Sequence, residues 1–268
     1  MASQPDYTLI NAIQRTVAVL ERLAPLREGL SVTELAESMG INKATIFRIL
    51  ATLESTGYVE QEPLSQRYRL TLKIIPLAFT LMDSIGLEDI YNDKMAKLAR
   101  EVGELVQFSV VQGEDAIFIA KAEGNKRIKL SSLLGIRAAL NASTVGKLWL
   151  ASLPEKDAIR IALAHGLNRY TDRTITTIDD LREEWNVVRQ CGYATTEGEY
   201  WDEVNAVGAP VCVGRSRRVV GALSVAGPAD RLPVERMQDL APQLMQVAAE
   251  IAAVWPRWSE DLGYLPQS

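Results

Sequence analysis

The chain has 268 residues, of which 47% are hydrophobic and 24% charged, and its 29 basic and 34 acidic residues leave a net charge of −5. This composition excludes a disordered chain, and the mild acidity means that any DNA-facing surface has to be local. No apolar stretch reaches the roughly 18 to 20 residues of a membrane span, and no signal peptide is recognisable, so we expect a cytoplasmic protein without a membrane partner.

The amino-terminal part begins with three predicted helices. Residues 9–24 predict an amphipathic helix, because apolar side chains recur there at helical spacing. These apolar positions are Ile13, Val17, Leu20 and Ala24. The segment Ser31-Val32-Thr33-Glu34 has the form of a capping box and starts a short helix that ends at Gly40. Asn42 is a good N-cap for the next helix, which runs to about residue 55. Two short helices so close together predict a helix-turn-helix.

The second helix of this pair has two distinct faces at about 100° per residue. One face gathers Ile46, Ile49, Leu50 and Leu53, and the other gathers Ala44, Thr45, Arg48, Ala51 and Thr52. Small side chains beside an arginine suit the major groove, where arginine binds guanine and a threonine methyl contacts thymine. An ordinary solvated helix face is the alternative. The candidate DNA-contacting residues of this helix are Lys43, Ala44, Thr45, Arg48 and Thr52.

A β-hairpin is predicted directly after this helix, with strands at 57–61 and 67–70 and a turn at 63–66. Period-two alternation places Tyr68 and Leu70 on one face and Arg67 and Arg69 on the other. We expect Arg67 and Arg69 to contact DNA phosphates. Helix, turn, helix and hairpin together predict a winged helix-turn-helix over residues 1–71. An apolar helix at 71–83 then predicts a linker over residues 72–86.

The pattern beyond residue 86 is mixed. Strands are predicted at 105–111, 116–122, 127–131, 192–195, 206–213 and 219–225. Helices are predicted at 87–101, 143–152, 155–165 and 178–191 and from Pro233 towards Trp255. This order predicts helices on a largely antiparallel sheet, as one α/β domain over residues 87–268. The expected fold class is therefore α+β with two domains.

Five fragments, in this order along the chain, resemble the IclR family of bacterial transcriptional regulators. They are LSVTELAESMGINKATIFRILATLESTGYVEQEPLSQRYRL, LNASTVGKLWLAS, NRYTDRTIT, CGYATTEGEY and VGAPVCVGRSRRVVGALSVAGPADRL. Each is weak alone, but together they cover essentially the whole chain. The resemblance implies a winged helix joined by a helix to a GAF-like ligand-binding domain, in a dimer or a dimer of dimers. It also implies a double-stranded DNA operator as partner, a small organic acid as effector and no enzymatic activity.

The residues themselves point to an anion site at one helix. Ser143 opens the helix at 143–152, and a helix N-terminus presents free amides and the positive end of a dipole. A carboxylate would bind well there, although Ser143 could cap the helix without any ligand. The resemblance places the effector at this helix start, which comprises Ser143, Thr144, Val145 and Gly146.

The resemblance also implies the remaining pocket walls. These are Thr196, Glu199, Ala206, Ser224 and Ala226, on strands expected to converge on the same cavity. Leu133, Leu134 and Leu140 could line it or could simply pack in the core.

The chain departs from the family pattern at three positions. Asn141 stands where many relatives have histidine, so effector binding should show little histidine-like pH dependence. Glu203 stands where relatives commonly have glycine, and Ala206 replaces a cysteine or other polar residue. The pocket is therefore less polar than in members that sense very small oxo-acids, and we expect a larger carboxylate, for example an aromatic one.

The scarcity of histidine and cysteine weighs against catalysis. His165, Cys191 and Cys212 are the candidates for a base and a nucleophile, and none lies in a recognisable catalytic motif. We expect both cysteines to be reduced and buried, His165 to end a helix, and neither a metal site nor a cofactor. A repressor is the default, since repression needs no polymerase contact. An activator with the same architecture and a ligand-binding module without DNA function are the alternatives.

Overall fold

A computed structural model describes residues 10–85, 87–126 and 134–255 and divides the chain into two compact units, Met1–Ser84 and Ile85–Ser268. The strand predicted near residues 127–131 and the candidate residue Leu133 lie outside the described residues.

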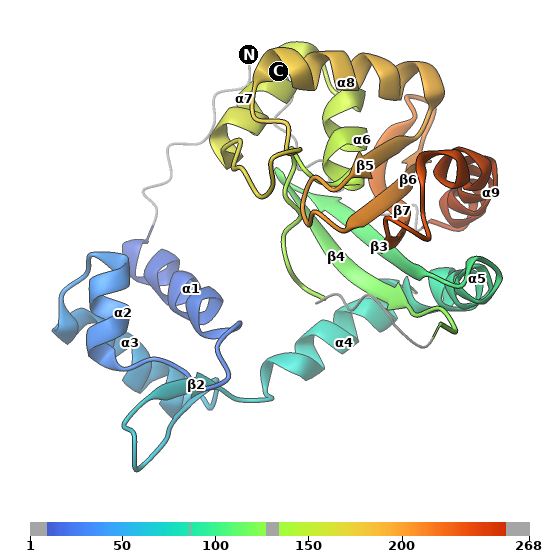
Figure 1. Ribbon diagram of the computed structural model, residues 1–268. Helices are drawn as coiled ribbons and strands as arrows, with labels where there is room; N and C mark the ends of the chain where they lie inside the picture. The colour runs from blue at the N-terminus through green and yellow to red at the C-terminus, as the bar shows by residue number, and fades with distance from the viewer. Residues whose placement is uncertain (1–9, 86, 127–133, 256–268) are drawn as a thin grey trace. The chain divides into compact units, whose positions relative to one another are not determined.

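The first unit contains, in its described part, three helices, a hairpin and a fourth helix (Figure 1). Their bounds are α1 (Asn11–Leu23), α2 (Val32–Met39), α3 (Lys43–Ser55), β1 (Val59–Gln61), β2 (Tyr68–Leu70) and α4 (Ile74–Ile85). β1 and β2 are antiparallel, with Glu60 opposite Arg69. The predicted helix-turn-helix and hairpin are confirmed, with strands shorter than the sequence pattern indicated.

Local signals in the sequence set the ends of α2 and α3. The Ser31 hydroxyl accepts from the Glu34 amide at 3.3 Å, and the Ser31 amide donates to the Glu34 carboxylate at 2.8 Å, so the capping box is complete. Gly40 ends α2 with φ 63°, a conformation that favours glycine. The Asn42 side chain then accepts from the Thr45 amide at 2.8 Å and starts α3.

The buried face of α1 differs from the one that the sequence predicted. Val19 and Leu23 are buried in the core of the first unit, whereas Ile13 and Val17 are 59% and 48% exposed. α1 carries two neighbouring apolar stripes, and its packing against α3 and β2 covers only one of them. The helical period was therefore correct, but it could not show which stripe faces the core. On α3 the predicted core face is confirmed, since Ile46 and Leu50 are fully buried.

The second unit is built around a five-stranded antiparallel sheet in the order β4-β3-β7-β6-β5. The strands are β3 (Leu105–Gln112), β4 (Asp115–Ala122), β5 (Ala194–Glu197), β6 (Val204–Val213) and β7 (Arg218–Pro228). The helices are α5 (Leu87–Val102), α6 (Thr144–Ser152), α7 (Glu155–His165), α8 (Ile178–Cys191) and α9 (Val234–Ala253). The elements predicted for the described residues are confirmed, with small shifts at their ends.

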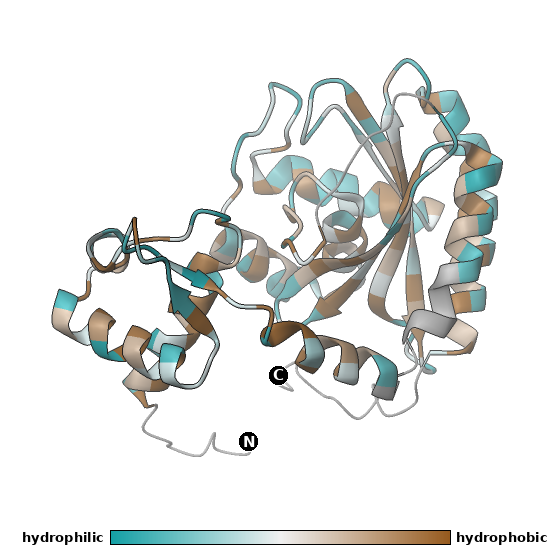
Figure 2. Cartoon of the chain, turned by 90° about the horizontal axis from the view of Figure 1, so that it is seen from below, coloured by the Kyte–Doolittle hydropathy of each residue, from teal (hydrophilic) through white to brown (hydrophobic). Residues whose placement is uncertain are grey.

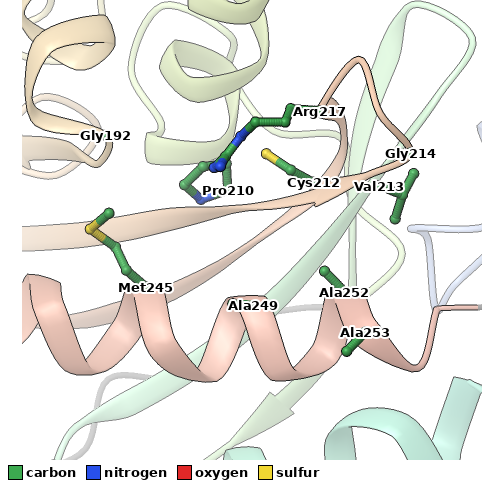
Figure 3. Close-up of a pocket in the computed structure, with 10 residues that line it drawn as sticks. All are labelled: Gly192, Pro210, Cys212, Val213, Gly214, Arg217, Met245, Ala249, Ala252 and Ala253. Carbon is green, nitrogen blue, oxygen red and sulfur yellow. The ribbon is translucent and has the colours of Figure 1, made fainter.

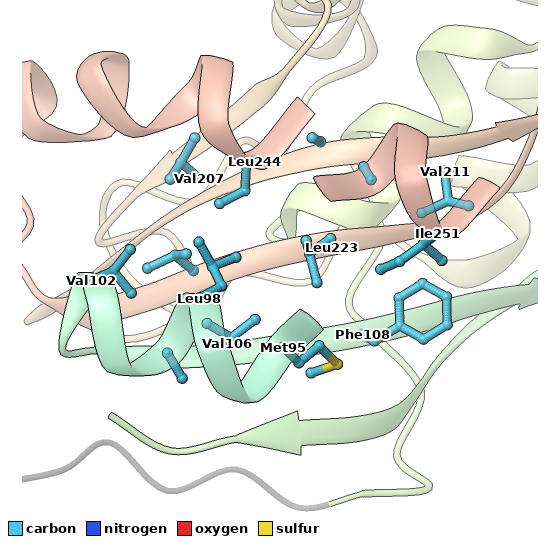
Figure 4. Packing of buried hydrophobic residues seen from close by; sticks show 14 of the residues in the cluster. Met95, Leu98, Val102, Val106, Phe108, Val207, Val211, Leu223, Leu244 and Ile251 are labelled. Carbon is cyan, nitrogen blue, oxygen red and sulfur yellow. The ribbon is translucent and has the colours of Figure 1, made fainter. Parts of the chain in front are cut away.

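Helices cover both faces of this sheet, and its central strands are strongly hydrophobic (Figures 1 and 2). On one face α5 and α9 pack over residues such as Phe108, Val207 and Leu223 (Figure 4). On the other face α6 packs directly on the strands, and the cluster around it includes Trp149 and Trp185. Two apolar cores on opposite faces hold the strands rigidly, which fixes the side chains that project from them.

Two smaller predictions have different outcomes. Cys191 is exposed and Cys212 only half-buried, so the expected burial was wrong for both, and both are free thiols. Cys191 is the last residue of α8, and its side chain is exposed to solvent there. His165 ends α7 as expected, and its Nε2 atom lies 3.8 Å from an oxygen of Asp115.

Candidate functional sites

The outer face of α3 is open to solvent. Lys43, Ala44, Arg48 and Thr52 are exposed, and Thr45 is half-buried. The Thr52 hydroxyl donates to the Arg48 carbonyl at 2.9 Å. Among the described residues, no carboxylate lies within ion-pair distance of the Arg48 guanidinium. Its donors can therefore bind an external acceptor without first breaking an ion pair.

The two arginines of the hairpin have different surroundings. The Arg67 guanidinium lies 2.8 Å from a Glu34 oxygen, and its Nε donates to the Gly29 carbonyl at 3.2 Å. Arg69 pairs with Glu60 at 2.7 Å, and both side chains are 51% exposed. Arg69 thus stays in solvent, while Arg67 ties the hairpin to the start of α2, a role that the sequence did not indicate.

Glu34, which binds Arg67, is also part of the capping box of α2. Hydrogen bonds from Ser31, and then from Arg67, lower the pKa of Glu34 to about 2, because they stabilise its charged form. The carboxylate of Glu34 thus caps α2 and holds the hairpin at once. This charge adds to the two backbone hydrogen bonds between Leu30 and Tyr68, which also hold the hairpin beside the helix-turn-helix.

In the second unit, the start of α6 is closely packed. The Ser143 hydroxyl accepts from the Gly146 amide at 3.2 Å, so the capping role is confirmed. Thr144, Val145 and Gly146 are all buried. A Cβ atom at Gly146 would lie 2.3 Å from the Leu140 carbonyl oxygen, so only glycine fits there. The chain before α6 therefore lies directly against the helix start.

The predicted strand residues lie in adjacent rows on one face of the sheet. Thr196, Ala206 and Ala226 are opposite one another across β5, β6 and β7, and Ser224 occupies the next row on the same face, opposite Gly208. A Cβ atom at Gly208 would be 2.7 Å from the Thr144 side chain. The start of α6 therefore lies over these rows, and the predicted strand and helix residues come together in space.

The residues before α6 divide between core and surface. Leu140 is 3% exposed and belongs to the core on the α6 side, whereas Leu134 is 47% exposed. Asn141 is buried, and its amide nitrogen donates to the carbonyls of Asn168 and Ile175 at 3.0 and 2.8 Å. Both of its donors thus hold the segment that leads to α8.

Lys147 is a buried lysine that the sequence analysis missed. Its ammonium lies 2.6 Å from Glu199, 3.0 Å from Glu184 and 2.9 Å from the Thr195 carbonyl oxygen. Burial raises the pKa of the Glu199 carboxyl, and the Lys147 charge opposes part of that effect. The second carboxylate oxygen of Glu199 is buried and has no hydrogen-bond partner. The sequence does carry a signal for this site, because Lys147 is the one charged residue in the apolar segment of α6.

A separate cavity of about 440 Å³ lies beside β6 and α9 (Figure 3). Pro210 and Cys212 line it from β6, and Met245 lines it from α9. Its described lining shares no residue with the predicted effector set. Burial raises the pKa of the Cys212 thiol, which keeps the thiol protonated and weakly nucleophilic at neutral pH.

A winged helix-turn-helix followed by an α/β unit is the architecture of a DNA-binding transcriptional regulator. Residues 79–253 match the family described as bacterial transcriptional regulator IclR C-terminal, and residues 12–63 match the IclR helix-turn-helix domain. The chain therefore belongs to the IclR family of transcriptional regulators, which are not enzymes. No helix in the described part of the chain is long and apolar enough to cross a membrane.

Individual proteins agree with this assignment. The transcriptional regulator KdgR of Escherichia coli is 28% identical over 250 residues, which are 93% of this chain and 94% of that protein. The solved structure of a putative IclR regulator from a Silicibacter species has a TM-score of 0.81 and 25% identity, covering 90% of this chain and 95% of that one. An IclR homologue from Microbacterium hydrocarbonoxydans, solved with 4-hydroxybenzoate, has a TM-score of 0.73 and 20% identity, covering 90% and 98%.

Proposed function

We propose that this protein is a cytoplasmic repressor that binds a palindromic operator as a dimer or a dimer of dimers and responds to a small organic acid. The outer face of α3 carries this proposal, because Arg48 is exposed there beside Ala44 and Ala51 and has no carboxylate partner among the described residues. Arg48 would bind a guanine in the major groove. Lys43, Thr45 and Thr52 would complete that contact surface.

The hairpin would contribute contacts to phosphate. Arg69 is half exposed, and its surface pair with Glu60 is weak enough to exchange for a phosphate oxygen. Arg67 would contribute mainly by holding the hairpin in place, because Glu34 and Gly29 occupy its donors. A bound repressor of this kind blocks the promoter without touching the polymerase.

Exposed apolar side chains support the assembly of two copies. Leu77 and Phe79 on α4 are 57% and 56% exposed, and the uncovered stripe of α1 adds Ile13 and Val17. A helix with apolar residues all round is normally buried. A second copy related by a two-fold axis would cover these residues and would place two α3 helices on a symmetric operator.

The effector would bind at the start of α6. The positive end of the helix dipole there favours a carboxylate, and the rows containing Thr196, Ser224 and Ala226 lie beneath it. Alanines at 206 and 226 offer no side-chain hydrogen bond, so they suit the apolar part of an acid larger than three carbons. The 4-hydroxybenzoate bound by the Microbacterium homologue is an acid of this kind.

Fluorescence anisotropy with DNA from the region upstream of the gene, at two salt concentrations, tests the proposal. Wild-type protein should prefer this DNA over scrambled DNA. Arg48→Ala should lose about 1 to 3 kcal/mol of specific binding free energy and should no longer discriminate between bases at one position of the operator. Arg160→Ala, at an exposed arginine of α7, is the matched control and should change nothing. An acid of more than three carbons should raise the melting temperature and alter operator affinity. Unchanged operator preference in Arg48→Ala would contradict the assignment of α3.

A further inference from the structure

Phe47 is a large apolar side chain that α3 leaves in solvent. It is 55% exposed, although its neighbours Ile46 and Ile49 are buried. A phenylalanine in water forgoes the free energy of burying its ring. Its position is informative, because the surrounding exposed residues of this helix are polar or small.

Phe47 and Arg48 flank a shallow strip on α3. At about 100° per residue the two side chains leave the helix in directions about 100° apart, and Ala44 and Ala51 lie between these directions. Both alanines are exposed and end at the Cβ atom. A flat edge, such as that of a base pair, can therefore approach the strip closely and touch the phenylalanine on one side and the arginine on the other.

The major groove offers one prominent apolar group, the C5-methyl of thymine, and phenylalanine is among the side chains that contact it. We propose that Phe47 reads a thymine methyl in each operator half-site, next to the guanine read by Arg48. Phe47 and Arg48 leave the same turn of α3 on either side of this strip, and bases rise about 3.4 Å per step, so we expect the thymine within one or two base pairs of that guanine. This inference rests on the proposed function, since it assumes sequence-specific DNA binding.

A second copy of the protein is not the partner that this side chain fits. The exposed apolar residues that the proposed dimer would cover lie on α1 and α4, whereas Phe47 lies on α3 between the DNA-facing residues Lys43 and Arg48. Burial of Phe47 in a dimer would also remove Arg48 from DNA. We therefore expect Phe47 to contact DNA and to leave assembly unaffected.

The test replaces thymine by deoxyuridine in an operator selected from random DNA by the full-length protein. This change removes only the methyl group. At one position per half-site, wild-type protein should lose about fourfold in affinity, the factor that corresponds to burial of one methyl group. Phe47→Ala should bind thymine and uracil operators equally. Phe47→Leu, which keeps an apolar side chain, should keep most of the sensitivity, and Arg48→Ala should keep it while losing the guanine preference.

Each outcome bears on a different claim. If wild-type protein is insensitive to uracil at every position, or if Phe47→Ala remains as sensitive as wild type, the thymine contact is wrong even though operator binding stands. If Phe47→Ala changes the mass of the assembly in solution, the side chain belongs to an interface between copies and the proposal is overturned. If wild-type protein selects no sequence at all, the proposed function fails and this inference fails with it. Unchanged melting of Phe47→Ala would show that folding is unaffected.

Discussion

At the scale of single residues, Lys147 and Glu199 form a buried ion pair in the second unit. Lys147 is 1% exposed and Glu199 7%, and burying two charges is costly unless they pair closely. The pair joins α6 to the segment after β5; Glu199 is one of the predicted effector residues, and Lys147 directly follows the predicted helix-start residues. Its loss should therefore affect the folding of the second unit more than any surface charge would.

Lys147→Met should destabilise the second unit by about 3 to 5 kcal/mol, because it leaves the Glu199 carboxylate buried without a cation. Burial raises the pKa of Glu199 and the Lys147 charge opposes that effect, so removal of this charge should raise the pKa of Glu199 further in the folded state. The raised pKa of Glu199 contributes stability below its unfolded pKa, where the group is protonated and neutral. This contribution is lost as pH rises through the pKa of Glu199 in the folded state. The deficit should thus be larger at pH 8 than at pH 5.

Urea unfolding followed by tryptophan fluorescence measures this deficit, because all five tryptophans lie beyond residue 148 and report on the second unit. Glu184→Gln is the control, since Glu184 is 24% exposed and water can replace its charge. The same deficit in both variants, or one that does not change with pH, would show that the Lys147 pair is not the stabilising contact described here.

At the scale of secondary-structure elements, the Glu34–Arg67 contact connects α2 to the hairpin. Glu34 has a pKa lowered to about 2, so its contribution to stability is present above the unfolded value near 4.5 and is lost as pH falls towards 2. Hydrogen exchange at the amides of α2 and β2 should therefore accelerate over this range. Glu34→Gln should show weaker protection at neutral pH and little further change in acid.

Arg67→Gln should raise exchange in the hairpin at neutral pH, whereas Arg69→Gln should not, because the Arg69–Glu60 pair is solvent-exposed. If the two variants behave alike, Arg67 does not tether the hairpin, and its predicted role as a plain phosphate contact becomes the simpler account.

How much of this structure the sequence could predict depends on how far apart along the chain the interacting residues lie. The capping box of α2 and the N-cap of α3 use residues three apart, so the sequence predicts both directly. The Arg67–Glu34 pair joins residues 33 apart and the Lys147–Glu199 pair residues 52 apart, and only the folded chain brings them together. The face of α1 was mispredicted for a related reason, since two apolar stripes compete and tertiary packing decides between them.

At the scale of the whole molecule, symmetry would connect the two functions. A single α3 reads only a few base pairs. In a dimer, binding of one α3 to its half-site would hold the second α3 close to the other half-site, so the second contact would form as an intramolecular step. The exposed apolar residues of α4 would form the interface of the dimer proposed above. Disrupting this surface should therefore weaken operator binding without changing how each half-site is read.

Leu77→Glu with Phe79→Glu should convert the assembly to monomers in analytical ultracentrifugation, because two carboxylates would otherwise be buried against their symmetry mates. Affinity for the full operator should fall towards that for a single half-site, while the preference for the half-site sequence stays the same. Leu163→Glu, at a residue of α7 with 58% exposure, is the matched control and should leave both the mass and the affinity unchanged. A double variant that remains dimeric would move the interface away from α4, and a monomer with full operator affinity would show that binding does not require two copies.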